Sequence, residues 1–222
     1  MPTITAPTPS AQGRRTTELV LFDWNGTVMD DLERAAAAAN QALARFGVAP
    51  LSTVDFQHSF TLPLVDWLSG LGIADEHAPS AAAHWNRAME VPAQARASAH
   101  STLTRLRDAG ILTGIVTAAD PKSVDQDITT NGLLGLFDLI HTGVTDKAGR
   151  LAGLRNLADH AVYVGDTAYD IVSARDAGFT SVSIAGGYQH PSLLAASDPD
   201  HHINDLDGVL ELRTLARASH RS

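Results

Sequence analysis

The stretch LVLFDWNGTVMDD, residues 19–31, decides the fold, because an uninterrupted apolar run ends there on a carboxylate. Leu19 to Phe22 contain no polar side chain, which is typical of a parallel strand that is buried on both faces. Asp23 follows at once, and an ionised side chain at the end of a buried strand is costly without a partner. We therefore expect Asp23 to face other functional groups at one edge of a parallel sheet.

Composition limits the class of protein. The chain has 222 residues, enough for one domain of ordinary size with a modest insertion. Its net charge of −9 argues against a general affinity for nucleic acid or for an anionic membrane. No apolar run approaches the roughly 20 residues that a membrane-spanning helix needs. The sequence has no cysteine, which excludes disulfides, zinc–thiolate sites and thiol nucleophiles.

The first residues carry no pattern of a packed element. Residues 1–16 are rich in Pro, Thr and Ser, and we expect them to form a disordered tail. Arg14-Arg15 is reminiscent of a twin-arginine export signal, but no apolar segment separates this pair from the first expected strand. We therefore expect a cytoplasmic protein. Both a monomer and a homodimer remain open.

Strand and helix patterns alternate over the second half of the chain. Apolar segments bounded by turn residues lie at 111–116, 137–143, 161–166 and 181–187. Between them, helical patterns begin at Asp120, Lys147 and Ala168. This alternation indicates an α/β fold with a doubly wound, Rossmann-like and mostly parallel sheet.

Only helical patterns occur between the first expected strand and the second. Helix starts are expected at Asp30 (in a capping box with Glu33), Ser52, Ser80 and Pro92. This block is too long to be a simple crossover between strands. We therefore expect a core domain formed by residues 17–30 and 101–222, and a small helical cap domain inserted at 31–100.

Polar side chains end the expected strands at the edge where open parallel sheets bind ligands. Asp23, Thr117 and Asp166 stand at such ends, and Asp170 lies one helical turn after Asp166. Converging carboxylates repel one another unless a cation lies among them, and an all-oxygen ligand set favours Mg²⁺. Lys147 is a candidate to bind an anionic substrate. Lys122 is the alternative, because the chain has only these two lysines.

Four segments together resemble the motifs of the haloacid dehalogenase (HAD) superfamily. They are DWNGT at 23–27, Thr117, Lys147 and GDTAYD at 165–170. They occur in the order of that family and span nearly the whole chain from about residue 17, and the helical insertion is similar to the family's C1-type cap. Within the family, the chain resembles phosphatases of the phosphoglycolate-phosphatase-like branch. The resemblance implies a Mg²⁺-dependent hydrolase of a small phosphorylated metabolite.

The resemblance also implies a role for each matching residue. Asp23 would be the nucleophile that takes up the phosphoryl group as an aspartyl-phosphate. Thr117 would bind the phosphoryl oxygens, and Lys147 would neutralise charge on the nucleophile and the phosphate. The Mg²⁺ ligands would be Asp23, Asp166, the backbone carbonyl of Asn25 and, nearby or through water, Asp170.

Two other reactions of the superfamily are disfavoured by this sequence. Phosphonate-cleaving members use a cap lysine, and residues 31–100 contain none. Dehalogenases have an aromatic residue at the position of Asn25 and do not need the acids at Asp166 and Asp170. Phosphoryl chemistry therefore remains.

Asn25 departs from the pattern of the family phosphatases, in which an Asp protonates the leaving group and then activates water. An amide cannot exchange a proton at neutral pH, and the lost help is worth roughly 10²–10⁴-fold in rate. The chain would then be a slow phosphatase, or one suited to good leaving groups such as acyl phosphates and aryl esters. The alternative is a phospho-ligand-binding or phosphoryl-transfer protein with weakened hydrolysis. Deamidation of Asn25-Gly26, which would regenerate an acid, is a further hypothesis.

The expected cap contains both cationic and aromatic residues that suit a substrate. The candidate anion contacts are Arg34, Arg45, Arg87 and Arg96, and the candidate apolar wall comprises Phe56, Phe60, Trp67 and Trp85. Most of these side chains are expected to be solvated or to form the core of the cap.

Overall fold

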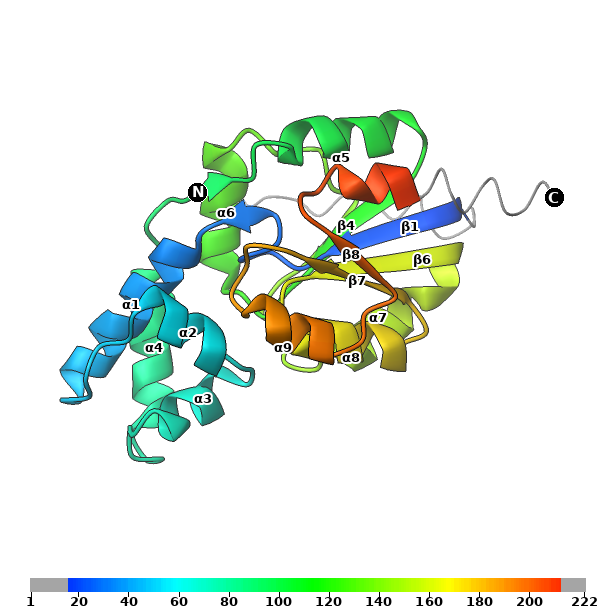
Figure 1. The fold of residues 1–222 in the computed structure, drawn as a ribbon. Coiled ribbons are helices and arrows are strands. Elements are labelled where there is room, and N and C mark those ends of the chain that lie inside the picture. Colours follow the sequence, from blue (N-terminus) through cyan, green and yellow to red (C-terminus); the bar gives the residue numbers. More distant parts are fainter. Residues whose placement is uncertain (1–15, 213–222) are drawn as a thin grey trace.

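A six-stranded sheet lies at the centre of the computed structural model, which describes residues 16–212 (Figure 1). In sheet order, the strands are β5 (Leu139–His141), β4 (Leu112–Val116), β1 (Thr16–Phe22), β6 (Ala158–Gly165), β7 (Thr180–Ile184) and β8 (His201–Ile203). Every neighbouring pair is parallel. The doubly wound, mostly parallel α/β fold predicted from the sequence is therefore confirmed. The predicted tail at 1–16 lies outside the described residues except for Thr16, where β1 begins.

Both faces of the sheet are covered by helices, as the apolar run of β1 predicts. The covering helices are α5 (Ala99–Asp108), α6 (Pro121–Thr130), α7 (Lys147–Leu154), α8 (Ala168–Asp176) and α9 (Pro191–Ala196), and a 3₁₀ turn (Arg155–Leu157) follows α7. Val20 and Phe22 pack with α5 and α6 in one apolar cluster. Leu19 and Leu21 pack with α7 and α8 in another cluster, on the opposite face. Figure 1 shows α5 on one side of the strands and α7 and α8 on the other.

Four helices form a separate group beside the sheet (Figure 1), which we term the helical group, residues 32–89. They are α1 (Leu32–Arg45), α2 (Thr53–Ser59), α3 (Leu64–Gly70) and α4 (Ala78–Ala88). An apolar cluster of their own, which includes Phe56, Trp67 and Leu68, holds them together. The chain enters the group through β2 (Met29–Asp30) and leaves it through β3 (Gln94–Ala95), and these short strands pair antiparallel. The division of the chain into two domains remains a prediction.

Some expected element boundaries are wrong. Helix α1 begins after Asp31, so Asp30 forms no capping box with Glu33. Ser80 lies inside α4, which starts earlier because Pro79 fits its first turn. Pro92 precedes β3 rather than a helix. Strands of two residues are too short to show a period, so β2 and β3 left no signal in a segment expected to be wholly helical.

Other local predictions are confirmed. Ser52 accepts a hydrogen bond from Asp55 N as the N-cap of α2, and Asp120 caps α6 through Lys122 N. The sequence analysis does not predict helix α9 and strand β8.

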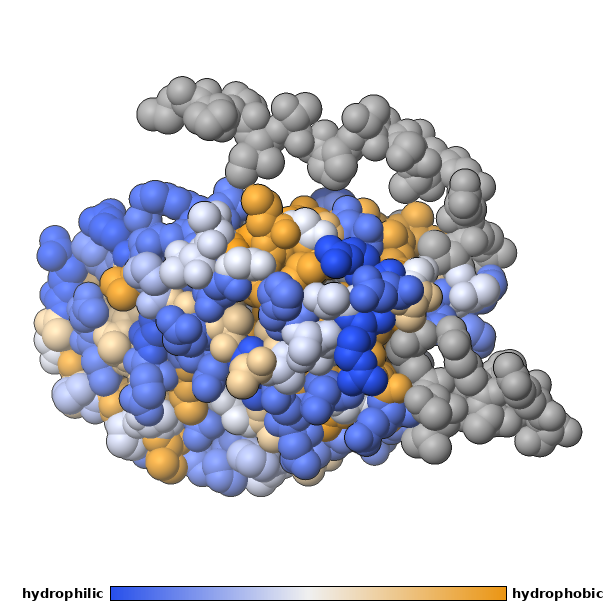
Figure 2. Space-filling view, turned by 90° about the horizontal axis from the view of Figure 1, so that it is seen from above, coloured by the Kyte–Doolittle hydropathy of each residue, from blue (hydrophilic) through white to orange (hydrophobic). Residues whose placement is uncertain are grey.

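No helix within residues 16–212 is long and apolar enough to cross a membrane. On the face shown in Figure 2, hydrophilic and apolar residues are interspersed.

Candidate active site

Asp23 and Asp166 follow the two neighbouring strands at which the strand order of the sheet reverses. The chain runs from β1 through β4 to β5 on one side and then continues with β6, β7 and β8 on the other. Ligands of open parallel sheets bind in the crevice at such a switch point. The N–H of Asp23 donates to the Val164 carbonyl oxygen at 2.9 Å, which fixes the carboxylate at the end of the ladder.

The turn after Asp23 winds around one carbonyl group. The N–H groups of residues 27–29 approach the Trp24 oxygen at 2.9–3.2 Å. Gly26 has a φ of +71°, and a Cβ at this position would collide with the Asp166 carboxylate. Glycine satisfies both the backbone conformation and the close approach. The turn therefore brings the backbone of residues 24–26 close to Asp166.

Three buried carboxylates and one lysine meet at this edge of the sheet. Asp23, Asp166 and Asp170 each offer an oxygen within 4.8 Å of the others. Lys147 Nζ lies 3.2 Å from Oδ1 of Asp23 and is hydrogen bonded to Oδ1 of Asp170. When all three acids are ionised, the one lysine leaves an excess of negative charge, which a divalent cation would offset.

The pKa values of these groups reflect burial and mutual charge. Burial raises the pKa of Asp23 to about 6, although Lys147 acts in the opposite direction. Burial also raises the pKa of Asp166 well above its ordinary value, and the nearby Asp170 and Asp23 add to this effect. Burial would lower the pKa of Lys147, but Asp170 and Asp23 outweigh it and the net shift is upward. The lysine is therefore charged at neutral pH. The repulsion that raises the pKa values of the acids would be relieved by a bound cation.

The donors of Asp23 and Asp166 fit a hard cation such as Mg²⁺. Oδ1 of Asp23 is buried, and its close polar neighbour is the ammonium of Lys147, with which it forms an ion pair at 3.2 Å. Each oxygen of Asp166 accepts one bond, Oδ1 from Thr27 Oγ1 at 2.9 Å and Oδ2 from Tyr188 N at 2.6 Å. A carboxylate oxygen has a second lone pair, so both acids keep capacity for a cation.

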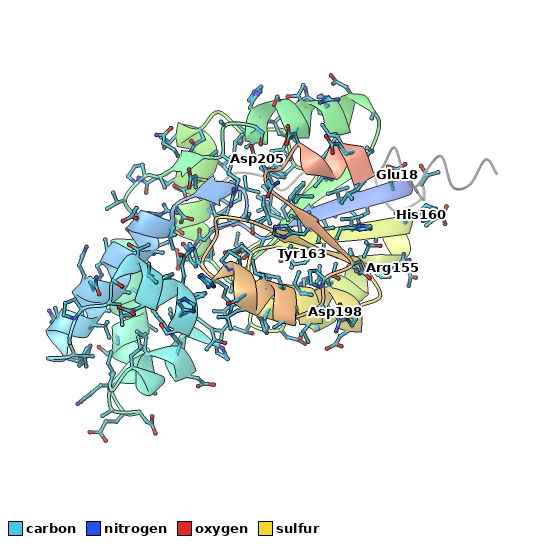
Figure 3. All side chains as sticks on the ribbon, in the orientation of Figure 1. Glu18, Arg155, His160, Tyr163, Asp198 and Asp205 are labelled. Atoms are coloured by element: carbon cyan, nitrogen blue, oxygen red, sulfur yellow. The ribbon has the colours of Figure 1, made fainter. Side chains whose placement is uncertain are left out.

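Asp170 is engaged more fully than the other two acids. Its Oδ2 accepts from both the N–H and the hydroxyl of Thr167, at 3.0 and 2.6 Å, which closes the capping box of α8. Its Oδ1 accepts from Lys147 and lies 3.4 Å from the hydroxyl of Tyr163, which donates to the Val116 carbonyl oxygen at 2.7 Å and comes from β6 near the middle of the sheet (Figure 3). These contacts position Asp170 as the partner of the lysine.

The two lysines lie in opposite environments. Lys147 is the first residue of α7, which begins there because Asp146 accepts from Gly149 N at 2.8 Å. Its side chain is completely buried. Lys122 lies on α6 with 71% of its side chain exposed, and it pairs with Glu90. The structure therefore brings Lys147, and not Lys122, to Asp23.

Thr117 and Asn25 reach the same site from separate turns. Thr117 is buried just after β4, and its hydroxyl oxygen accepts from Ala119 N at 3.2 Å. Oδ1 of Asn25 lies 3.5 Å from Nη2 of Arg34, at the limit of a hydrogen bond. The Gly26 N–H, which would attack the Asn25 side chain during deamidation, donates to Asp31 at 2.7 Å. Deamidation remains a hypothesis.

A buried ionic network that the sequence did not reveal joins α1 of the helical group to α6, one of the helices that cover the sheet. Arg34 of α1 donates to Oδ1 and Oδ2 of Asp127 in α6, at 3.0 and 2.9 Å, and to Asp31 at 2.7 Å. Asp127 also accepts from Nε1 of Trp24 at 3.3 Å. Arg34 was expected only as an anion contact, and this pairing across 93 residues leaves no sequence signal.

Tyr188 is a second residue that sequence reasoning missed. It follows Gly186 and Gly187 after β7, and its ring packs against Phe56 and Phe60 with centroids at 5.5 and 5.1 Å. Its hydroxyl donates to Asp31 at 2.9 Å, and its backbone N–H donates to Asp166. An aromatic residue directly after a strand-ending Gly-Gly is the signal that marks this position.

A cavity of about 90 Å³ lies between the acids and the helical group. Its floor includes Asp23, Asn25, Thr117 and Asp166. Its wall from the helical group is formed by Phe60, Leu62, Leu64, Trp85, Asn86 and Met89. Of the aromatic residues expected to form the wall, Phe60 and Trp85 line this cavity, whereas Phe56 and Trp67 lie in the core of the helical group.

Comparison with known proteins relates the chain to one family. Residues 20–184 match the model of the haloacid dehalogenase-like hydrolase family. Phosphoglycolate phosphatases of Synechococcus elongatus and Vibrio cholerae are 24% and 26% identical, covering 89% and 88% of this chain and 97% and 96% of the relatives. Pyrophosphatase PpaX of Bacillus velezensis is 24% identical, with 87% of this chain and 94% of the relative covered.

Solved structures agree on the fold. A hydrolase from Pseudomonas syringae has a TM-score of 0.75 at 20% identity, covering 90% of this chain and 98% of that one. A haloacid dehalogenase-like family protein from Streptococcus pneumoniae has a TM-score of 0.74 at 19% identity, with 88% and 98% covered. The names of the three sequence relatives support the enzyme class predicted from the motifs, a phosphatase. Because the family model spans most of the chain, the protein belongs to the haloacid dehalogenase-like hydrolase family.

Proposed function

We propose that the protein is a Mg²⁺-dependent phosphatase that hydrolyses a small phosphate monoester through an aspartyl-phosphate on Asp23. The observation that carries the proposal is the position of Asp23. It lies at the switch point of the sheet, on the floor of the cavity, with Lys147 Nζ at 3.2 Å and Asp166 in the same acidic cluster. A binding protein has no need of a carboxylate placed in this way.

In this proposal, an oxygen of Asp23 attacks phosphorus, the ester P–O bond breaks, and the leaving group departs with the electron pair. Water then attacks the phosphoaspartate and releases phosphate with the carboxylate restored. Lys147 holds positive charge beside the nucleophile and the phosphoryl oxygens throughout. Thr117 donates its hydroxyl hydrogen to a phosphoryl oxygen. Mg²⁺, when bound, would neutralise charge on the transferring group.

The residues that would hold Mg²⁺ are Asp23, Asp166 and the backbone carbonyl of Asn25. Asp170 would act mainly through Lys147, because Lys147 and the two donors of Thr167 already bind its two oxygens. The helical group, within the expected cap at 31–100, would cover the site and limit the access of water.

Asn25 limits the acid–base part of this chemistry. Neither the departing oxygen nor the attacking water can exchange a proton with an amide. We therefore propose slow hydrolysis of esters whose leaving group needs protonation. The second candidate function, binding or transfer of a phosphoryl group with weakened hydrolysis, rests on the same residue.

The test is phosphate release from a panel of aryl, acyl and alkyl phosphates by the wild type, Asp23→Asn and Lys122→Ala, with Mg²⁺ and with EDTA. We expect the wild type and Lys122→Ala to release phosphate at similar rates, because Lys122 is exposed and lies outside the acidic cluster. EDTA and Asp23→Asn should each abolish release. A wild type that binds phosphate esters but releases none would favour the second candidate function.

A further inference from the structure

The wall that faces the acidic cluster carries no positive charge. Five of the six side chains that the helical group contributes are apolar, and the sixth is the neutral amide Asn86. No lysine, arginine or histidine is among the described residues that line the cavity. On the side of the sheet, the cavity is lined by a further acid, Asp120, in addition to Asp23 and Asp166. A leaving group with its own carboxylate or phosphate would therefore meet negative charge without a compensating cation.

The arginines that were expected to contact anions are engaged elsewhere. Arg34 is bound by Asp31 and Asp127, and its side chain is only 8% exposed. Arg96 donates to three backbone carbonyl oxygens, those of residues 26, 27 and 185. These contacts leave neither guanidinium free for an anionic substrate.

The other two cap arginines lie apart from the cavity. Arg45 and Arg87 are exposed. They lie near His84, which packs against Phe46, and after desolvation their charges are the next causes that lower the pKa of this histidine. Neither arginine lines the cavity. The lysine of α6, Lys122, is paired with Glu90 and does not line the cavity either.

The residue at the position of the expected general acid is an amide in the same cavity. Asn25 lines it, and an amide cannot protonate an alkoxide. A phenolate needs no such help, because a phenol has a pKa of about 10, as the tyrosine side chain does, and an alkanol is far less acidic. The aromatic rings of Phe60 and Trp85 in the wall suit a flat apolar group.

From these two independent features we infer that the preferred substrates are phosphate monoesters of uncharged phenols. The inference rests on the proposed function and specifies its substrate class. Asp23 displaces a phenolate, the P–O(aryl) bond breaks with its electron pair on the phenol oxygen, and that oxygen takes a proton from water. The amide of Asn86 is the one polar group of the wall that can hydrogen bond to a neutral substituent of the ring.

Three matched esters test the inference with purified full-length protein and Mg²⁺. Phenyl phosphate is the reference, benzyl phosphate keeps the ring but has a poor leaving group, and 3-carboxyphenyl phosphate keeps the leaving-group acidity but adds a charge. We expect kcat/KM for phenyl phosphate to exceed that for each of the others by about tenfold or more. Equal rates for phenyl and 3-carboxyphenyl phosphate, or for phenyl and benzyl phosphate, would overturn the inference while the proposed function stands. Silence toward all three esters together with phosphate release from acyl or alkyl phosphates would overturn the inference alone, and silence toward the whole panel would overturn both.

Variants separate the two features. Asn25→Asp should raise kcat/KM for benzyl phosphate by about 10- to 100-fold and that for phenyl phosphate by much less, because kcat/KM reports the step in which the leaving group departs and a restored acid matters most for a poor leaving group. Asn86→Arg should raise the 3-carboxyphenyl-to-phenyl ratio of kcat/KM by about tenfold, since a bidentate cation then faces the carboxylate. Arg87→Ala changes the adjacent exposed residue outside the cavity and should leave that ratio unchanged. An unchanged ratio in Asn86→Arg would contradict the assigned wall.

Discussion

Tyr188 donates its backbone N–H to Oδ2 of Asp166 at 2.6 Å while its ring lies among the aromatic side chains of the helical group. Its hydroxyl also binds Asp31, next to the first residue of α1. One residue therefore contacts both a proposed Mg²⁺ ligand and the helical group. The placement of the two is linked through this side chain.

Removal of the Tyr188 contacts in two steps should separate their contributions. Tyr188→Phe loses only the bond to Asp31, which keeps its bonds from Gly26 and Arg34, and should cost about 1 kcal/mol of unfolding free energy. Tyr188→Ala also removes the ring and should cost about 3–5 kcal/mol. Denaturant unfolding measures both changes. Amide exchange should be faster in α1 and α2 for Tyr188→Ala only, and equal exchange in the two variants would contradict the link.

Arg34 should contribute more to stability than any exposed arginine of the same helix. Arg34→Met leaves Asp31 and Asp127 buried without their cation, and we expect a loss of about 3–5 kcal/mol. Arg45→Met, in the exposed last turn of α1, is the matched control and should change stability by less than about 0.5 kcal/mol. Chemical denaturation of both variants gives the comparison, and similar losses would show that the buried network is not a main stabilising element.

Much of this arrangement follows from the sequence and some of it does not. Asp23, Thr117 and Asp166 were placed at strand ends because apolar runs locate strands well, and strand ends of a parallel sheet meet at one edge. Of the two lysines, Lys147 is favoured over Lys122 as the site residue by its position in the series of motifs. The structure brings Lys147 beside Asp23 and leaves Lys122 exposed.

The contacts between the helical group and the elements around the sheet were not predictable in the same way. The bond between Arg34 and Asp127 joins residues that are far apart in the chain, and neither helix pattern depends on it. Asp31 follows the expected cap residue Asp30 by one position. The side chain of Asp31 accepts hydrogen bonds from Gly26, Tyr188 and Arg34 and does not cap α1. A buried carboxylate gains more from these three donors than from one helix cap.

Lys147 should be needed for the stability of the Mg²⁺-free protein. Lys147→Met removes the only lysine in contact with Asp23 and Asp170 and leaves buried carboxylates without a counter-charge, at a cost of about 3–5 kcal/mol. Lys122→Ala is the matched control and should cost at most about 1 kcal/mol, because its pair with Glu90 is exposed. Thermal unfolding in EDTA measures both. A loss in Lys147→Met no larger than that in Lys122→Ala would contradict the assigned role.

Binding of Mg²⁺ should depend on pH through the acidic cluster. Burial raises the pKa of Asp23 to about 6 and that of Asp166 well above its ordinary value. Between about pH 4, where an aspartate of the unfolded chain titrates, and these raised pKa values, the Mg²⁺-free folded protein holds more protons than the unfolded chain. These groups therefore make its stability fall as the pH rises through this range. Mg²⁺ competes with the same protons, and its stabilising effect should grow with pH.

Thermal unfolding with and without saturating Mg²⁺, at about pH 5 and about pH 8, measures this dependence. We expect a clearly larger upward shift of the midpoint at the higher pH, and little shift at either pH in Asp166→Asn. A Mg²⁺ shift that is the same at both pH values, or that survives in Asp166→Asn, would place the cation elsewhere.

The central claim, that Asp23 is the nucleophile, is tested most directly by acid quenching during turnover. The protein is mixed with phenyl phosphate and Mg²⁺, quenched, digested and analysed by mass spectrometry. We predict one added phosphoryl group on the peptide that contains Asp23. The adduct should be absent with EDTA and in Asp23→Asn, and long-lived because Asn25 cannot activate water. Continued phosphate release by Asp23→Asn at the wild-type rate, with no adduct on the wild-type peptide, would contradict the claim.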